Sequence, residues 1–205
     1  EKNNYIIGVV KGIVGITRYN ITIRGEANHA GTTPMELRKD ALTMAANLLV
    51  KIDQASHRIG TPFVSTVGQI NVKPGAINVI PGEVNFTLEM RDMDRSHIEH
   101  LINEVTLYTE SINDFQFELE LLIDKPNVET DQLISSIIEG VCKDKRVLYD
   151  IMASGAGHDA KEFASKVPIG MIFVPSKGGK SHCPDEFTPW DDIKIGTEVL
   201  LETIL

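Results

Sequence analysis

The feature that most constrains the fold is an alternation of apolar and polar residues, which occurs four times between residues 16 and 123. A period of two places the apolar side chains of a strand on one face. In one such segment the inward residues are Val84, Phe86, Leu88 and Met90. The alternation predicts strands at residues 18–24, 63–72, 84–92 and 115–121, and residues 77–80 are expected to resume the second strand after the Pro74-Gly75 turn.

Two segments with helical periodicity interrupt these strands, at residues 40–57 and 94–112. In the first of them the predicted apolar stripe consists of Leu42, Ala45, Ala46, Leu49 and Ile52. The element order between residues 16 and 124 is therefore β-α-β-β-α-β. This is the ferredoxin-like pattern, in which two helices cover one face of an antiparallel sheet.

The flanking segments have a different character, because their strands are apolar on both faces, as in α/β domains. Such strands are expected near residues 5–15, 147–152 and 169–174, and helices at residues 131–142, 158–166 and 190–205. The simplest organisation is a ferredoxin-like domain, residues 16–124, inserted into an α/β domain. Residues 1–15 and 125–205 would form part of that α/β domain, with most of it lying upstream of residue 1.

Composition excludes several classes of function. The chain has 205 residues, of which 42% are hydrophobic, and a formal net charge of −9. A net acidic surface repels phosphate backbones, so we expect no nucleic-acid partner. No apolar run approaches the roughly 20 residues of a membrane span, and residues 1–4 do not resemble a signal peptide. We therefore expect no membrane association and a cytoplasmic location.

The two cysteines fit no disulfide or zinc-finger spacing, which agrees with a reducing compartment. Cys142 lies among apolar residues of a predicted helix and is interpreted as a core residue. Cys183 follows His182 in a glycine-containing loop. A nucleophilic role would require an activating base, so Cys183 is interpreted as a neighbour of the functional residue.

Three of the six histidines, His29, His158 and His182, each lie in a glycine-containing loop after a predicted strand, where functional residues concentrate. For His29 the alternatives are a functional role and turn packing. Near His158, backbone N–H groups at a helix start suit an anion, or Asp159 caps that helix. The remaining histidines lie on helices and are interpreted as surface residues; these are His57, His97 and His100.

Five motifs occur in the order known from one enzyme family and extend over essentially the whole chain. They are NHAGTTPM at 28–35 with Arg38 and Asp40, NVIPG at 78–82, Arg91-Asp92, SGAGHDA at 154–160 and SHxPxE at 181–186. Together they resemble the zinc-dependent N-carbamoyl-L-amino-acid hydrolases, allantoate amidohydrolases and β-ureidopropionases of the zinc exopeptidase-like superfamily. The resemblance implies a ferredoxin-like lid domain, which also mediates dimerisation, inserted in a zinc-exopeptidase-like α/β domain that is truncated here.

The resemblance also implies roles for individual residues. His182 corresponds to a ligand of one of two zinc ions, for which manganese, nickel or cobalt can substitute. His29, Asn78 and Arg91 correspond to lid residues that hold the substrate carboxylate or the oxyanion, with His29 as the catalytic donor, and Gly157 to a backbone contact with substrate. These residue types fit the hydrolysis of an amide. A two-metal site generates hydroxide, an imidazole stabilises the oxyanion, and a guanidinium binds a carboxylate.

The family's His-x-Asp pair, its Glu-Glu pair and its other histidine ligand lie before the lid, and the sequence has no counterpart of them. A catalytic zinc needs about three protein ligands, so we expect this chain to be inactive alone. The first hypothesis is a fragment of an amidohydrolase that cleaves a carbamoyl or ureido group on a small carboxylate. The alternatives are a non-catalytic dimerisation or small-acid-binding module, and a fragment of a related dipeptidase or deacylase.

The lid is expected to form a homodimer whose active sites are shared. The first and third strands of the sheet are expected to run parallel, which places His29 and Arg91 at one edge and Asn78 at the opposite edge. A seven-residue strand is roughly 23 Å long at ~3.3 Å per residue, which a small ureido acid cannot span. Residues of two subunits would then have to meet at one substrate.

Overall fold

A computed structural model describes residues 3–205, so Glu1 and Lys2, the start of the segment inspected for a signal peptide, lie outside the described residues. The chain divides into two compact units. We call Gly15–Asn127 the central unit, and Glu1–Val14 with Val128–Leu205 the terminal unit. No described helix is both long and apolar enough to cross a bilayer.

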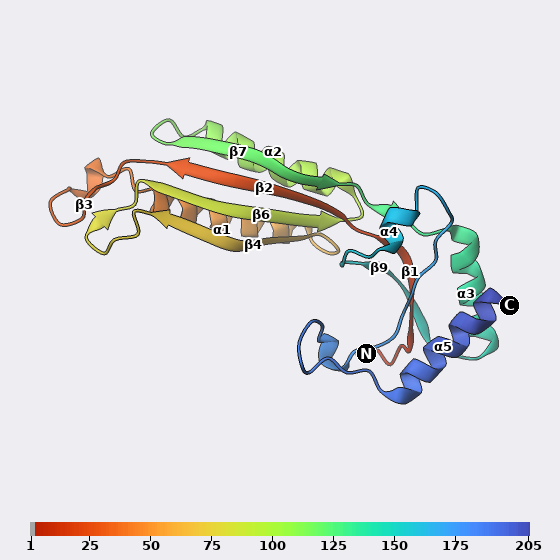
Figure 1. The fold of residues 1–205 in the computed structure, drawn as a ribbon. Helices are drawn as coiled ribbons and strands as arrows, with labels where there is room; N and C mark the ends of the chain where they lie inside the picture. The colour runs from red at the N-terminus through yellow and green to blue at the C-terminus, as the bar shows by residue number, and fades with distance from the viewer. Residues whose placement is uncertain (1–2) are drawn as a thin grey trace. The chain divides into compact units, whose positions relative to one another are not determined.

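The central unit is built on a four-stranded sheet with the order β4-β6-β2-β7, in which every neighbouring pair is antiparallel. Two helices, α1 and α2, lie along one face of this sheet (Figure 1). The strands are β2 (Gly15–Arg24), β4 (Val64–Lys73), β6 (Glu83–Asp92) and β7 (Gln116–Lys125), and the helices are α1 (Ala41–Ile59) and α2 (Arg95–Glu110).

The core of the central unit lies between the sheet and the helices. The inward residues predicted for β6 are all fully buried; they are Val84, Phe86, Leu88 and Met90. The stripe predicted for α1 is partly wrong, since its buried residues are Ala41, Ala45, Leu48, Ile52 and Ala55, and Leu42 is exposed. The helix begins at Ala41, where the Asp40 carboxylate caps the N–H groups of Leu42 and Thr43. The buried stripe starts at Ala41 and recurs every three or four residues, so Leu42 lies off it.

The strand directions correct two predictions. The first and third strands of the unit, β2 and β6, are antiparallel, with Ile16 opposite Arg91 and Arg24 opposite Glu83. The reason is that the α1 crossover places β4 parallel to β2, and the chain then reverses into β6. Residues 77–80 do not resume β4 either, because the Gly82 N–H binds the Lys73 carbonyl and starts β6 directly opposite the end of β4.

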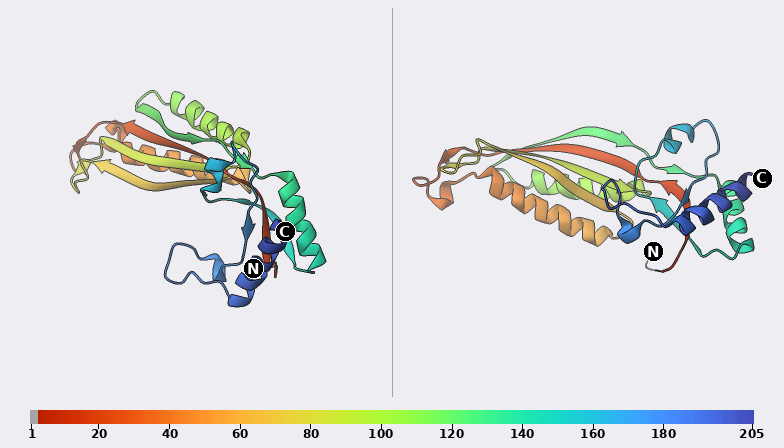
Figure 2. Two further views of the ribbon diagram at one scale, coloured as in Figure 1. Left: turned by 45° about the vertical axis from the view of Figure 1, so that its right-hand side comes forward. Right: turned by 60° about the horizontal axis from the view of Figure 1, so that its bottom comes forward.

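Two segments, residues 25–40 and 74–82, project beyond one end of the main sheet (Figure 2). We call them the tip. Its two-stranded ribbon pairs β3 (Asn28–His29) with β5 (Val79–Ile80), and a 3-10 helix, Met35–Leu37, follows. Backbone bonds tie the tip to the sheet: Gly25 N–H donates to the Gly82 carbonyl at 2.9 Å, and Glu26 N–H to the Lys39 carbonyl at 2.8 Å.

Replacing Gly25 by alanine is expected to destabilise the chain by about 1–3 kcal/mol through overpacking. A Cβ atom there would lie 2.0 Å from the backbone carbonyl oxygen of Lys39. Gly68→Ala is the matched control, because nothing lies within 4 Å of its Cβ position, and its effect should stay within about 0.5 kcal/mol. Urea denaturation followed by circular dichroism measures both, and equal midpoints would contradict the close approach of the two segments.

The terminal unit surrounds one central strand, β1 (Ile7–Ile13), which pairs with all the other strands of the unit. These are β8 (Val128–Glu129), β9 (Tyr149–Ser154) and β10 (Ile172–Phe173), and the helices are α3 (Gln132–Asp144), α4 (Ala160–Phe163) and α5 (Trp190–Ile204). The core includes Ile7, Val9, Ile138, Cys142 and Val199, so the core position predicted for Cys142 is confirmed.

The strand β9 was predicted to be buried on both faces, and this is wrong. Ile151 is 49% exposed, and Leu148 just before the strand is 59% exposed. Among the described residues, β9 pairs in parallel with β1 alone, so part of its apolar surface is left uncovered within the unit. The helix and strand predicted at residues 158–166 and 169–174 are also shorter than expected, at Ala160–Phe163 and Ile172–Phe173.

Candidate functional site

The tip brings two of the predicted site residues together. His29 lies opposite Val79 in the β3–β5 ribbon, and the N–H of Ala30 donates to the carbonyl oxygen of Asn78 at 3.0 Å. Both His29 and Asn78 are exposed. The expectation that Asn78 and His29 lie at opposite ends of the sheet is therefore wrong, because β3 and β5 leave the sheet at the same end.

A network of local hydrogen bonds holds His29 in place. The Asn28 side-chain oxygen accepts from the His29 N–H at 2.8 Å, and the Gly31 N–H donates to the ring Nδ1 at 3.0 Å. The Thr33 hydroxyl donates to the His29 carbonyl at 2.8 Å. These contacts show that turn packing and a functional role are compatible for His29, since its backbone and Nδ1 are engaged while the side chain remains exposed.

Arg91 lies at the other end of the same sheet, and the prediction that it accompanies His29 is also wrong. Arg91 is eight residues along β6 from Glu83. Glu83 pairs with Arg24, the last residue of β2 before the chain enters the tip. At ~3.3 Å per residue this separation is about 26 Å. A single central unit therefore places Arg91 too far from His29 and Asn78 for all three to contact one small molecule.

Arg91 lies on the polar face of the sheet, as the alternation predicts, and is oriented by a carboxylate. Its Nε donates to Glu89 Oε1 at 2.8 Å, while Arg18 binds Glu89 Oε2. Burial alone would raise the pKa of Glu89, but the hydrogen bonds from Arg18 and Arg91 outweigh it and lower that pKa. The Glu89 carboxylate thus stays ionised between the two guanidinium groups of Arg18 and Arg91.

In the terminal unit, Gly157 belongs to the turn after β9, and a buried serine organises this turn. The Ser154 hydroxyl lies 2.7 Å from His158 Nε2 and accepts from the Ala156 N–H at 3.2 Å. The His158 ring also packs against Phe173, with ring centroids 5.7 Å apart. Asp159 occupies the N-cap position of α4 but makes no side-chain capping bond, so the interpretation of Asp159 as a helix cap is wrong.

His182 lies in the exposed loop between β10 and α5. The Glu186 carboxylate accepts from its backbone N–H at 2.8 Å, and the Lys177 N–H closes the base of the loop on the Phe187 carbonyl. His182 has a positive φ of 56°, a conformation uncommon for residues other than glycine. Such a backbone is a reason to suspect function, because it persists only where the surroundings hold it.

The described residues do not assemble a metal centre by themselves. Within residues 3–205, no group of three or more His, Cys, Asp or Glu side chains is arranged to hold an ion. A zinc ion takes about three to four protein ligands, and His182 with its neighbours falls short of that number. The predicted zinc pair therefore does not fit the described residues by themselves.

The histidines interpreted as surface residues all have ordinary partners. His97 Nδ1 lies 2.8 Å from the Asp92 carboxylate, His100 Nε2 lies 3.0 Å from Glu104, and His57 Nδ1 lies 2.9 Å from the Asp53 carbonyl. Cys183 is exposed, whereas burial raises the pKa of Cys142 and keeps it a thiol. No feature of these five residues adds to the candidate site.

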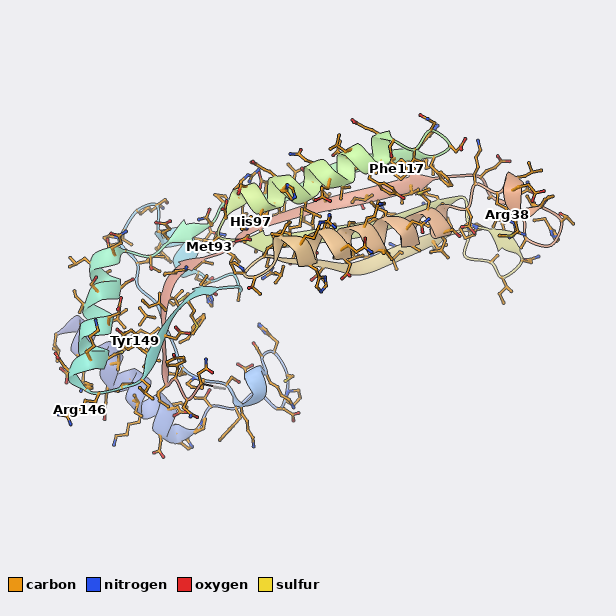
Figure 3. All side chains as sticks on the ribbon, turned by 180° about the vertical axis from the view of Figure 1, so that it is seen from behind. Arg38, Met93, His97, Phe117, Arg146 and Tyr149 are labelled. Carbon is orange, nitrogen blue, oxygen red and sulfur yellow. The ribbon has the colours of Figure 1, made fainter. Side chains whose placement is uncertain are left out.

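Sequence reasoning passed over Arg38, whose guanidinium group is directed at the loop that carries His29 (Figure 3). The available signal was its position within the first motif, beside Pro34 and Asp40. The hydrogen bond between Ser154 and His158 was missed as well. Its signal was the i, i+4 spacing across two glycines, which a sequence alone does not distinguish from a flexible turn.

Comparison with known proteins agrees with these motifs. Residues 26–205 match the model of peptidase family M20/M25/M40. The chain is 38% identical over 209 residues to the N-carbamoyl-L-amino-acid amidohydrolase of Pseudomonas sp. (strain NS671), covering all of this chain and 50% of that protein. It is 36% identical over 204 residues to the allantoate amidohydrolase of Escherichia coli (strain K12), covering 98% of this chain and 49% of that protein.

The fold agrees as well. The crystal structure of an amidase of the hydantoinase/carbamoylase family from Burkholderia phymatum superimposes with a TM-score of 0.90 at 30% identity, covering all of this chain and 50% of that one. The chain thus spans about half the length of the curated relatives it matches. On the strength of the family match and the shared mixed α/β fold, the chain belongs to peptidase family M20/M25/M40.

Proposed function

We propose that this chain supplies the substrate-binding and dimerisation part of a metal-dependent amidohydrolase. The enzyme would cleave the C–N bond of a carbamoyl or ureido group on a small carboxylate, as in N-carbamoyl amino acids or allantoate. The observation that carries the proposal is the placement of His29 and Asn78 on one exposed tip, where the Ala30 N–H donates to the Asn78 carbonyl and the Gly31 N–H holds the His29 ring from one side. Relatives named for these two reactions support the choice of substrate class.

Each predicted site residue has a chemical role in this proposal. Arg91 binds the substrate carboxylate, since a guanidinium presents paired donors to a carboxylate. His29 and Asn78 donate hydrogen bonds to the carbonyl oxygen and to the oxyanion that forms on attack. Gly157 supplies a backbone contact from its exposed turn, where a Cβ would meet no atom within 4 Å.

Metal dependence is part of the proposal, although the described residues form no site for the metal. His182 is proposed as one ligand of one of two ions, zinc or else manganese, nickel or cobalt. The other ligands would have to come from outside residues 3–205. Because Cys142 and Cys183 are free thiols, a reducing cytoplasmic setting is also proposed.

We also propose a homodimer through the central unit, with active sites shared between copies. Arg91 lies about 26 Å along the sheet from the strand end that leads to His29 and Asn78, by strand geometry. The corrected strand directions group His29 with Asn78 instead of with Arg91. These three residues of one copy still cannot all reach one small substrate. A two-fold arrangement solves this, because the tip of one copy can meet Arg91 of the other.

The test compares this chain with a chimera that joins it to the remaining half of the Pseudomonas relative. We expect the chain alone to bind no stoichiometric pair of metals and to turn over neither N-carbamoyl amino acids nor allantoate, even with added zinc or manganese. The chimera is expected to hydrolyse one of these ureido acids in preference to acyl amino acids and dipeptides. Ammonia or free amino acid release measures both.

Three outcomes would contradict the proposal. Turnover by the chain alone would show a complete site within it. A chimera that prefers acyl amino acids or dipeptides would be a deacylase or dipeptidase. A correctly folded, metal-loaded chimera that binds small acids without turnover would indicate a non-catalytic binding module.

A further inference from the structure

Two nitrogens of the Arg38 guanidinium, Nε and Nη2, donate to backbone carbonyl groups of the tip. Its Nη2 donates to the Ala30 carbonyl at 2.6 Å and to the Thr33 carbonyl at 2.9 Å, and its Nε donates to Thr33 at 3.0 Å. The side chain is half-buried and spans the loop that follows His29.

The loop that Arg38 closes returns to His29 at several points. The Thr33 N–H donates to the His29 carbonyl at 3.2 Å, and the Thr33 hydroxyl donates to the same oxygen at 2.8 Å. Between these anchors, the Gly31 N–H reaches His29 Nδ1 at 3.0 Å. The bond to the ring therefore depends on a loop whose two ends are held by one guanidinium group.

The bond from Gly31 decides which ring nitrogen of His29 carries the proton. A backbone N–H can only donate, so Nδ1 must present its lone pair, and the neutral ring then carries its hydrogen on Nε2. Two other histidines have the opposite arrangement. The Nδ1 atoms of His57 and His97 face a carbonyl oxygen and a carboxylate, which can only accept.

We propose that Arg38 is a positioning residue for His29. By closing the loop it keeps the Gly31 N–H on Nδ1, and so the exposed ring presents Nε2–H as a hydrogen-bond donor. In this tautomer Nε2 has no lone pair, so neutral His29 donates to a carbonyl oxygen or an oxyanion and does not act as a general base. The role in catalysis rests on the proposed function, whereas the tautomer and its dependence on Arg38 do not.

Nuclear magnetic resonance of the ¹⁵N-labelled 205-residue chain tests the inference directly. At about pH 8 an ordinary histidine is neutral, given its usual pKa of about 6.5. We expect His29 in the Nε2–H form, with a ¹⁵N–¹⁵N scalar coupling across the hydrogen bond between Gly31 N and His29 Nδ1. His57 and His97 should show the Nδ1–H form in the same spectrum. Absence of the coupling, or an Nδ1–H form for His29, would overturn the inference.

Substitutions then test the dependence on Arg38. Arg38→Lys keeps the charge but loses the planar set of donors, so the coupling between Gly31 and His29 should disappear. Arg58→Lys is the matched control, because Arg58 pairs with Glu104 on the helical side of the unit, and it should leave the coupling unchanged. An unchanged coupling in Arg38→Lys and in Arg38→Ala would show that Arg38 does not position the ring.

A second variant covers the case in which the Arg38 substitutions unfold the tip. In Gly31→Ala the new Cβ would lie 3.3 Å from Cε1 and 3.5 Å from Nδ1 of His29, so the ring must shift by a few tenths of an ångström while Arg38 is retained. The coupling should become smaller, with the remainder of the spectrum preserved. A coupling of unchanged size would contradict the close contact between Gly31 and the ring.

Kinetics of the chimera separate this inference from the proposed function. Arg38→Lys should lower kcat by up to about 10²-fold through misplacement of His29, with KM nearly unchanged. If the coupling depends on Arg38 but the chimera does not hydrolyse ureido acids, the proposed function fails and the positioning role stands. If the chimera is active and Arg38→Lys changes neither coupling nor kcat, the positioning role fails alone.

Discussion

Replacing His29 by alanine in the chimera is expected to slow hydrolysis of an N-carbamoyl amino acid by roughly 10²–10³-fold, the usual loss for an oxyanion donor. The metal content should stay the same, because His29 lies on the tip and is not a proposed ligand. His182→Ala should instead reduce the occupancy of one metal. Steady-state kinetics and elemental analysis of both purified variants measure the two effects.

His57→Ala serves as the matched control for these substitutions. His57 is an exposed histidine in the last turn of α1, bonded only to its own helix, so its removal should change neither turnover nor metal content. Loss of metal in the His29 variant would refute its assignment as a substrate-side donor. Full activity in that variant would remove His29 from the site altogether.

Mixing two nearly inactive variants of the chimera, Asn78→Ala and Arg91→Ala, is expected to restore activity. Each mixed dimer would contain one intact site, in which the wild-type tip of one copy meets the wild-type Arg91 of the other. Random exchange makes half of the dimers mixed, so recovery should approach about one quarter of wild-type activity for a two-fold dimer. Activity is measured after subunit exchange has been verified with two differently tagged copies.

The structure supplies a control that the sequence could not. His29 and Asn78 lie on the same tip, so a mixture of His29→Ala with Asn78→Ala places one defect in every site and should recover nothing. Recovery in this control would mean that the tip residues serve different sites. No recovery in the Asn78 and Arg91 mixture, despite proven exchange, would mean that each copy builds its own site.

Patterns within single elements were readable from the sequence because they depend on local geometry. The alternation in β6 predicts that Phe86 and Leu88 are buried and that Arg91 lies on the polar face, and all three are so placed. Asp40 and Asp94 were placed at the starts of predicted helices, and both cap the helices that follow. The sequence places His29 and His182 in loops; the structure has His182 in a loop, whereas His29 ends the two-residue strand β3.

Chain direction and distance between elements were not readable in the same way. The sequence is compatible with Asn78 at the end of a strand of the main sheet, and periodicity cannot distinguish this from the short ribbon with β3. In the structure the Gly82 N–H binds the Lys73 carbonyl, so β6 begins opposite the end of β4 and residues 74–82 lie outside the sheet. The pairing of β5 with β3 then places Asn78 near His29 and leaves Arg91 at the far end.

What the sequence by itself determined is therefore which side chains face the core, which residues lie in loops and which family the motifs resemble. These follow from periods of two and 3.6 residues and from short motifs, all of which are local properties of the chain. The tertiary structure alone decided the antiparallel pairing of β2 with β6, the neighbours of His29 and the carbonyl groups to which Arg38 donates. Those depend on hydrogen bonds between segments far apart in the chain or across a loop, and no local pattern encodes their direction.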